Sequence, residues 1–341
     1  MEGESQVSGN ASQRQFSRST KVLIWIVLPA VFVALGTASP LTAFLSLFIL
    51  APTFWLIRYD RAHPLNQRLD PETFIWTYIL TGTVGTAIVI VVQSILSYAL
   101  ALALFREETR KLLVEIQRGE DDVAKLDPEM LATRRQMASQ WQYWVFMLVF
   151  AFFAAGFPEE LLKYSGLVYA RRRGRITHEH NYITLGAAAA LGFSTVENIA
   201  FVYAATRQNQ NPGKLLLTLV ERVVIGSPMH VMGGLLIGLS AVRRDFYGES
   251  FSLAQILGIP ILFHGTWDFS LFGISALDGN VGWVHPRGKS LLMVFGIAIA
   301  IQGILALIIR KRFVSWKADE HFHSRIRGIF DTKAIGLEKL E

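Results

Sequence analysis

Long apolar blocks, separated by short polar segments, dominate the pattern of hydrophobic and polar positions along the chain. A membrane-spanning helix needs roughly 20 mostly apolar residues, and the blocks approach or exceed this length. Their predicted boundaries are 22–37, 40–57, 74–105, 143–169, 184–206, 215–241, 252–275 and 289–310. The pattern therefore predicts an all-α integral membrane protein with about eight transmembrane helices.

Polar stretches around these blocks divide the chain into six predicted parts. These are a disordered polar N-terminus (1–21), N-terminal transmembrane helices (22–105), a polar amphipathic insert (106–142), a core of four spans (143–275), the last span with its preceding loop (276–310) and a polar C-terminal tail (311–341). The insert is rich in charged residues and has leucines at helical spacing, which favours a helical segment on the membrane surface. We therefore expect a multi-pass protein in direct contact with the lipid bilayer.

The composition of the 341 residues agrees with this class: 52% are hydrophobic and only 18% are charged. Cysteine is absent, which excludes disulfides, thiolate metal ligands and cysteine nucleophiles. The net charge of +6 is explained by basic residues in connecting segments, as in other membrane proteins. No basic run is interleaved with aromatic residues, so we expect no nucleic-acid partner.

Charged residues inside the apolar blocks are the first candidates for function, because each costs roughly 2.5–3.5 kcal/mol in a bilayer core. The fourth block contains Glu159, Glu160 and, one turn later, Lys163. Successive helical positions differ by about 100°, so one carboxylate can face a central cavity while the other pairs with Lys163. Pro158 loosens the helix before them. The plainer alternative is a helix that ends here with a solvated polar cap.

The fifth block carries Glu197 and Asn198 near its middle. A buried glutamate suits general acid or base catalysis, and an asparagine amide can donate to a developing oxyanion. Glycine and alanine residues earlier in the block permit close helix packing. The alternative is a structural hydrogen-bonded pair that holds helices together.

The sixth block contains Arg222 and His230, and the seventh contains His264 and Asp268. His264 and Asp268 are four residues apart and share one helix face, so that Asp268 can orient the imidazole. A single histidine in a membrane is as often a packing residue as a ligand. No role is predicted for the other histidines, His63, His178, His180, His285, His321 and His323.

One polar motif falls in each of four consecutive spans, and this combination is more specific than any of its members. Because consecutive spans alternate in direction, the four motifs are expected at a similar depth. A cavity of carboxylates and imidazoles can activate water, either with a glutamate base or through a metal, and zinc accepts such ligands. The candidate metal ligands are Glu160, His230 and His264, and the pattern leaves open whether zinc or no metal is used.

These segments resemble the PrsW family of membrane proteases, within the wider superfamily of CAAX-type prenyl endopeptidases and bacteriocin-processing proteins. The matching motifs are Glu159-Glu160-Leu-Leu-Lys163, Gly186 through Leu191-Gly192-Phe193 to Glu197-Asn198, Arg222 with Pro228-Met229-His230, and His264-Gly-Thr-Trp-Asp268. They cover about residues 150–275 with order and spacing intact. The N-terminal spans, the insert and the tail are not part of the core motif.

The resemblance implies a PrsW-like protease core at 143–275, with a four-helix catalytic centre that cleaves a membrane-anchored protein. In this interpretation the paired glutamates activate water and Glu197 and Asn198 complete the site. His230 and His264 would bind the transition state or a metal. The supporting residues would be Lys163, Arg222 and Asp268. The motifs favour a membrane-protein substrate over a CAAX substrate, and no oligomeric state is predicted.

Two other classes of function could use the same buried polar residues. A proton-coupled transporter uses chains of Glu, Asp and His as proton relays. Such folds often contain internal repeats of their spans, and we find none here. A catalytically inactive membrane scaffold would keep the motifs for helix packing or partner binding. Substitutions in a scaffold would lower stability rather than turnover.

Basic residues predict the orientation in the membrane. An even number of spans places both termini on one side, together with the arginines of loop 58–73 and of segment 171–175. The insert 106–142 also holds seven lysines and arginines and lies on the other side, but short loops carry the most weight. We therefore expect a reporter fused to either terminus to be found in the cytoplasm. A reporter on the far side of the membrane would contradict this topology.

Overall fold

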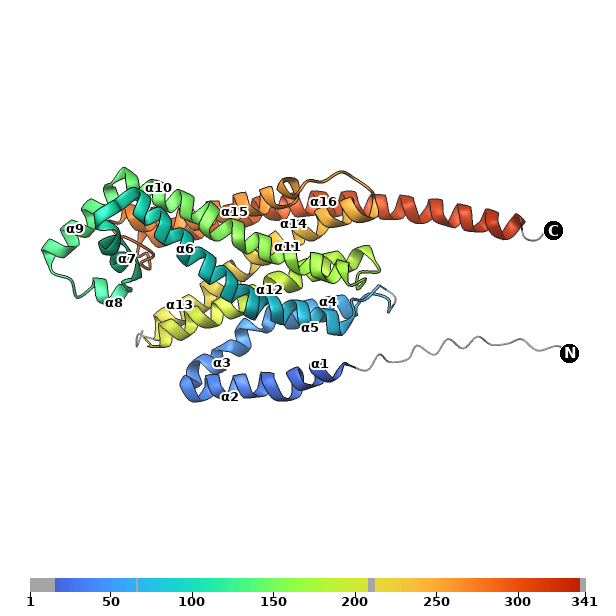
Figure 1. Ribbon diagram of the computed structural model, residues 1–341, viewed down its shortest axis with the longest axis horizontal. Coiled ribbons are helices and arrows are strands. Elements are labelled where there is room, and N and C mark those ends of the chain that lie inside the picture. Colours follow the sequence, from blue (N-terminus) through green and yellow to red (C-terminus); the bar gives the residue numbers. More distant parts are fainter. Residues whose placement is uncertain (1–15, 66, 208–211, 338–341) are drawn as a thin grey trace.

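The computed structural model describes residues 16–65, 67–207 and 212–337, and these residues form helices without any strand (Figure 1). This confirms the all-α fold class. The α-helices are α1 (Arg18–Val22), α2 (Leu28–Ala38), α3 (Pro40–Ile49), α4 (Ala51–Arg61), α5 (Pro71–Leu80), α6 (Thr86–Phe105), α7 (Thr109–Gln117), α8 (Glu120–Val123), α9 (Pro128–Ser139), α10 (Trp141–Val149), α11 (Phe157–Arg172), α12 (Glu179–Arg207), α13 (Pro212–Val220), α14 (Ser227–Phe246), α15 (Leu253–Leu277) and α16 (Lys289–Leu337). Wider π-helical turns join several of them without a break, at Leu23–Val27, Thr81–Gly85, Phe150–Gly156 and Glu221–Gly226.

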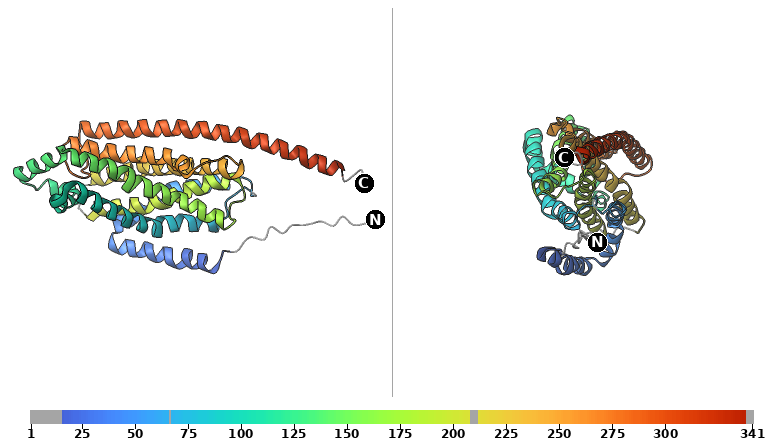
Figure 2. Two further views of the ribbon diagram at one scale, coloured as in Figure 1. Left: turned by 45° about the horizontal axis from the view of Figure 1, so that its top comes forward. Right: turned by 90° about the vertical axis from the view of Figure 1, so that its right-hand side faces the viewer.

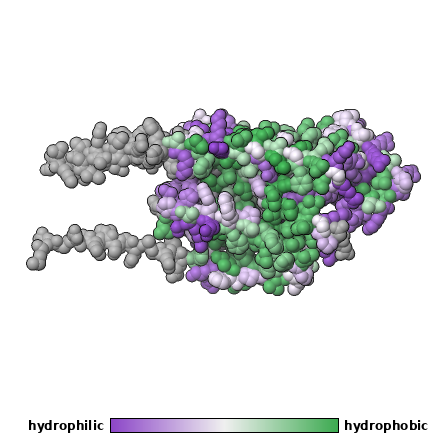
Figure 3. Space-filling model, turned by 180° about the vertical axis from the view of Figure 1, so that it is seen from behind, coloured by the Kyte–Doolittle hydropathy of each residue, from purple (hydrophilic) through white to green (hydrophobic). Residues whose placement is uncertain are grey.

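Within the described chain, seven continuous helical segments are long and apolar enough to cross a membrane. They are Arg18–Ala38, Pro40–Arg61, Pro71–Gln117, Trp141–Arg172, Glu179–Arg207, Pro212–Phe246 and Lys289–Ala318. The molecular surface shows the matching apolar belt between two polar ends (Figure 3). The protein is therefore an integral, multi-pass membrane protein.

The predicted span at 252–275 forms α15, which is not among these seven segments. Its 25 residues are long enough to cross a bilayer, but it carries His264, Trp267 and Asp268, which make it less apolar. Helix α15 runs back through the bundle beside α14 and α16 (Figure 1). As a result, the start of α1 and the end of α16 lie at the same end of the bundle, as an even number of passes requires.

Three boundaries differ from the sequence-based expectation. The first helix begins at Arg18, because the Ser17 side chain caps it by accepting a hydrogen bond from the backbone N–H of Thr20. The rest of the predicted disordered N-terminus lies largely in residues 1–15, outside the described residues. The insert, for which a helical segment was expected, contains three short α-helices, α7 to α9. The last span and the tail form one helix up to Leu337, since no proline interrupts it.

Several helices begin where the sequence combines a capping side chain with a proline in the first turn. The capping oxygen accepts a backbone N–H that has no partner within the helix, and proline has no N–H to leave unpaired. The pairs of cap and proline are Ser39 with Pro40 for α3, Asp70 with Pro71 for α5, and Asp127 with Pro128 for α9. The first pair makes the tight turn of the predicted hairpin between the first two spans.

Helix α12 lies at the centre of the bundle, with α1–α2 and α16 on opposite outer faces (Figure 2). Every residue from Glu179 to Thr195 is buried. Small residues allow this helix to touch its neighbours backbone to backbone: a Cβ atom on Gly186 would lie 2.2 Å from the carbonyl oxygen of Gly234 in α14. Such close contacts are typical of helix packing in membranes, and they place α12 and α14 for the site described below.

The insert packs at the end of the bundle opposite the two described chain ends (Figure 1). Leu112 and Met137 are buried there with residues of α10. Arg134, also buried, donates to the backbone carbonyl of Val281 in the loop between α15 and α16 and to Glu115 Oε2 at 2.6 Å. These contacts tie the insert to loop 278–288.

The Gly186–Gly234 contact generates a stability prediction. Gly186→Ala should destabilise the protein by about 1–3 kcal/mol, because the new methyl group overlaps backbone that cannot rotate away. The matched control is Gly258→Ala on the exposed side of α15, where an added Cβ has open space. Thermal unfolding of both variants in detergent measures the effect. Equal stability of the two variants would show that the contact does not constrain packing.

Candidate active site

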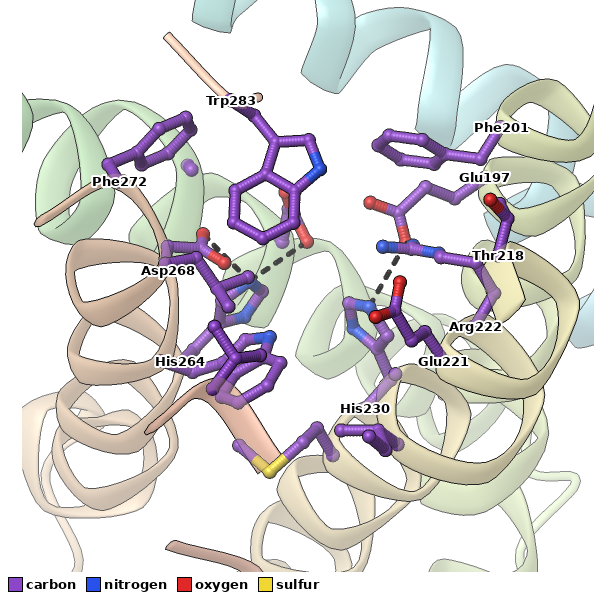
Figure 4. Close-up of a pocket in the computed structure, with 18 of the residues that line it drawn as sticks. Glu197, Phe201, Thr218, Glu221, Arg222, His230, His264, Asp268, Phe272 and Trp283 are labelled. Carbon is purple, nitrogen blue, oxygen red and sulfur yellow. Dashed lines mark hydrogen bonds and ion pairs between the residues drawn. The ribbon is translucent and has the colours of Figure 1, made fainter. Parts of the chain in front are cut away.

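A cavity of about 470 Å³ lies among the spanning helices and gathers most of the predicted site residues (Figure 4). Helices α11, α12, α14 and α15 each contribute side chains to it, as does the π-helical turn before α14. The ionisable residues that line it are Glu120, Glu159, Glu160, Glu197, Glu221, Arg222, His230, His264, Asp268 and His285. The four motifs of the sequence therefore converge on one buried space.

His264 lies between the two adjacent glutamates of α11. Its Nδ1 atom is 2.8 Å from Glu160 Oε1, and its Nε2 atom is 3.3 Å from Glu159 Oε2. Asp268 Oδ2 is 3.5 Å from the same Nε2 atom, so the expected pairing on one face of α15 is present. The two carboxylates thus reach opposite nitrogens of one imidazole instead of pointing at the same atom.

Lys163 joins the glutamate pair to the second histidine. Its fully buried ammonium group donates to Glu160 Oε1 at 2.5 Å and lies 3.1 Å from His230 Nδ1. Of the two glutamates, Glu160 is the one that pairs with Lys163. One lysine therefore holds α11 against α14.

Glu197 forms the other side of the cavity. Its Oε2 atom is 3.1 Å from His230 Nε2 and also accepts a hydrogen bond from Arg222. The Arg222 guanidinium lies over the Phe201 ring, 4.1 Å from the ring centroid. Glu197 is less enclosed than the other two glutamates: its side chain is 24% exposed, compared with 6% for Glu159 and 2% for Glu160.

Asn198 lies behind Arg222 and does not line the cavity. Its Oδ1 atom accepts from Arg222 Nε at 2.8 Å, and its amide donates to Ser227 Oγ at 2.9 Å and to Ser194 Oγ at 3.2 Å. The side chain is fully buried. This geometry suits a residue that positions Arg222, in contrast to the expected role as an oxyanion donor.

Local helix geometry explains how these side chains reach the cavity. The π-helical turn Phe150–Gly156 precedes Glu159 and Glu160, and the turn Glu221–Gly226 contains Arg222. Each π-helical turn inserts an extra residue into the helix, which rotates the following side chains and is frequent at functional sites. Pro158 and Pro228 follow these turns in the first turn of α11 and α14, where proline is tolerated.

Three side chains can offer ligand atoms to one metal ion. Ligand atoms of Glu159, His230 and His264 all lie within 4.8 Å of one another. The metal ligands predicted from the sequence included Glu160 in place of Glu159. In the structure the Glu160 carboxylate instead contacts Lys163 and His264 Nδ1. His230 contacts Lys163 and Glu197 through its two nitrogens, so an ion bound to it would replace one of these contacts.

Sequence reasoning missed several residues of the cavity. His285, for which no role was predicted, lines it and places Nε2 3.0 Å from Glu221 Oε2. Gln93 of α6 also lines it and donates its amide to Glu159 Oε1 at 2.8 Å. An isolated amide in a long apolar block was the available signal for Gln93, whereas a loop histidine gives none.

The insert and loop 278–288 close one end of the cavity. Glu120 of α8 accepts a hydrogen bond from Arg287 in that loop, and its Oε2 atom is 3.2 Å from Lys214 Nζ in α13. Burial alone would raise the pKa of Glu120, but these two cations together hold it below its usual value. Trp283, from the same loop, extends across the cavity between Asp268 and Glu197 (Figure 4). Ion pairs among three elements therefore bridge this end.

The fold and the site together define the class of protein. It is a helical membrane protein whose spanning helices enclose glutamates and histidines around one cavity. The family described as PrsW family intramembrane metalloprotease matches residues 129–301, about half of the chain. The chain belongs to this family.

Two curated relatives illustrate the similarity. Protease PrsW of Shouchella clausii (strain KSM-K16) is 31% identical over 124 residues, which are 36% of this chain and 54% of the relative. Protease PrsW of Clostridioides difficile (strain 630) is 30% identical over 130 residues, 37% of this chain and 52% of the relative. The chain thus spans about half the length of the curated relatives it matches. No solved structure matches the chain.

The contact between His285 and Glu221 predicts a pH dependence of stability. The hydrogen bond to Glu221 raises the pKa of His285. The stability that it contributes is fully present below the ordinary histidine pKa of about 6.5 and is lost as pH rises through the raised value. His285→Asn should therefore lower the unfolding temperature most at acidic pH and least at alkaline pH.

Thermal unfolding of wild type and His285→Asn in detergent, across a series of pH values, measures this difference. In a Glu221→Gln background the pH dependence of the difference should be largely absent, because the partner carboxylate is gone. A destabilisation that is the same at every pH would contradict the ion-pair interpretation.

Proposed function

We propose that this chain is an intramembrane endopeptidase that hydrolyses a peptide bond of a membrane-associated protein with water activated by glutamate and histidine side chains. The observation that carries the proposal is the convergence of Glu159, His230 and His264 on one cavity among the spanning helices. Membership of the PrsW family and the name of the two relatives support the same reaction class.

The residues present fit a zinc ion. The Oε2 atom of Glu159 is buried and has no hydrogen-bond partner among the described residues, which suits an oxygen kept for a cation. One carboxylate and two imidazoles, Glu159, His230 and His264, resemble the three-ligand sets of catalytic zinc, which leave a position open for water or substrate. When bound, zinc would lower the pKa of a water molecule to near 7 and polarise the scissile carbonyl.

Outer contacts would hold these ligands in place. Glu160 Oε1 lies within hydrogen-bonding distance of His264 Nδ1, at 2.8 Å. His264 Nε2 therefore faces Glu159. A carboxylate on the second nitrogen of a ligand histidine fixes its ring orientation and makes it a better donor to a metal. Glu160 is therefore assigned an orienting role, and Lys163 balances its charge.

Glu197 is the best-placed proton acceptor. Its ion pair with Arg222 stabilises the carboxylate, and it is the glutamate of the three that is most open to the cavity. A general base must reach the water from which it takes a proton. Arg222 lines the same cavity and can donate to the carbonyl oxygen as negative charge develops on it.

The proposed reaction is balanced without an oxidant or reductant. A water oxygen bonds to the carbonyl carbon while Glu197 accepts a proton from that water. The proton then passes to the amide nitrogen as the carbon–nitrogen bond breaks, which leaves a carboxylic acid and an amine. The cavity lies among the spanning helices, so a membrane-associated substrate fits it best.

The cavity itself favours an enzyme over a scaffold. Side chains kept only for packing would leave little space beside them, but these side chains both contact one another and border a cavity of about 470 Å³. Buried carboxylate oxygens without hydrogen-bond partners occur in both Glu159 and Glu160. Such unpaired groups are costly, and in native proteins a catalytic role or a bound ion is one explanation for them.

Substitution of the polar cluster tests the proposal. Glu197→Gln should lower cleavage at least about 100-fold, the scale of a lost acid–base group. Glu160→Gln should lower it about 10–100-fold, as for a lost orienting partner, and His230→Ala should abolish it by removing a proposed ligand, while each protein still inserts. The measurement is proteomics of membrane-protein fragments in cells that carry wild type or each variant. The matched control is Glu108→Gln, which changes an exposed glutamate outside the cavity.

A strong chelator should also abolish cleavage of the substrate found in this way, and added zinc should restore it.

If all three variants insert and still cleave, the polar cluster is not the catalytic site. If they lose thermal stability to the same extent as they lose cleavage, the scaffold interpretation gains support instead.

A further inference from the structure

Gln93 contacts the proposed site from outside the part of the chain that matches the family. It lies in α6, whereas the match begins at residue 129. Its side-chain amide donates to Glu159 Oε1 at 2.8 Å, so Glu159 is contacted by α6 as well as by His264 of α15. A separate helix therefore contributes to the orientation of a proposed ligand.

The two oxygens of Glu159 have different surroundings. Oε1 accepts from Gln93, while Oε2 is buried, has no hydrogen-bond partner in the described chain and lies 3.3 Å from His264 Nε2. A carboxylate whose one oxygen is held by an amide cannot turn freely about its last bond. The contact with Gln93 thus leaves Oε2 as the oxygen that faces His264 Nε2.

We propose that Gln93 is a positioning residue that orients the Glu159 carboxylate for metal binding. The inference rests on the proposed function, because it assumes that Glu159, His230 and His264 bind zinc. Partners of this kind behind metal ligands typically change metal affinity by 10–100-fold when they are removed. Gln93 would act through Glu159 and would not touch the metal.

The surroundings of Gln93 argue against a role in packing alone. Gln93 lines the catalytic cavity and also a second cavity of about 410 Å³, which extends between α6, α7 and α10. Its side chain, which borders both cavities, is only partly enclosed by other residues. Its amide is instead directed at the buried Glu159 side chain, to which it donates a hydrogen bond of 2.8 Å.

The neighbouring Ser94 provides a matched control. It lies on the same helix and lines the second cavity, but its hydroxyl donates to its own helix, to the Ile90 carbonyl at 2.7 Å. Ser94→Ala therefore removes a polar group from α6 without touching Glu159. Gln93→Met keeps the length of the side chain and removes the donor.

The experiment measures the zinc affinity of the full-length protein, purified in detergent, by competition with a chromophoric chelator. Gln93→Met should bind zinc about 10–100-fold more weakly than wild type, and Ser94→Ala should bind it as wild type does. The thermal stability of the zinc-free proteins is measured in parallel. It should be the same for all three if Gln93 acts on the ligand and not on the fold.

The outcomes separate this inference from the proposed function. Zinc binding by wild type with unchanged affinity in Gln93→Met would overturn the role of Gln93 and leave the peptidase proposal intact. Equal weakening in both variants, or a matching loss of zinc-free stability, would also overturn it. No zinc binding by wild type would overturn the zinc site of the proposed function and this inference with it.

Discussion

The site depends on charge pairing inside the spanning helices. A charged group in the bilayer core costs roughly 2.5–3.5 kcal/mol, and a buried ion pair offsets its own desolvation only when further hydrogen bonds complete it. Lys163 meets Glu160, and Arg222 meets Glu197, in each case with a histidine or an asparagine adding a further contact. Removal of one member of a pair would leave an uncompensated buried charge. Each pair also joins two helices or adjacent turns, so the pairing fixes the geometry of the cavity.

Close backbone contact makes this pairing possible. Gly186 allows α12 to approach α14, and Gly192 allows it to approach α5, where an added Cβ would lie 2.2 Å from the Tyr78 carbonyl oxygen. Only with helices this close can the side chains of Glu197 and His230 meet across the α12–α14 interface at 3.1 Å. Small residues along one helix thus determine which polar groups can reach one another.

Helical spacing explains what could be predicted from the sequence and what could not. The pairs Glu160–Lys163 and His264–Asp268 lie within single helices, so their separation in the chain is sufficient to place them. Both Glu159 and Glu160 reach His264, and a π-helical turn that precedes them changes the rotation of α11, which simple helical spacing does not predict. The contacts of Gln93 and His285 depend on packing between distant segments, which no local pattern records.

The parts of the cavity come from two different regions of the chain. The proposed ligands and their charge partners lie within residues 129–301, which match the family. Gln93, which touches Glu159, and Glu120, which bridges the end of the cavity, both precede that segment. The N-terminal spans and the insert are therefore not simply attached to a complete site. Residues outside the family match thus supply both a contact to a proposed ligand and a contact that closes one end of the cavity.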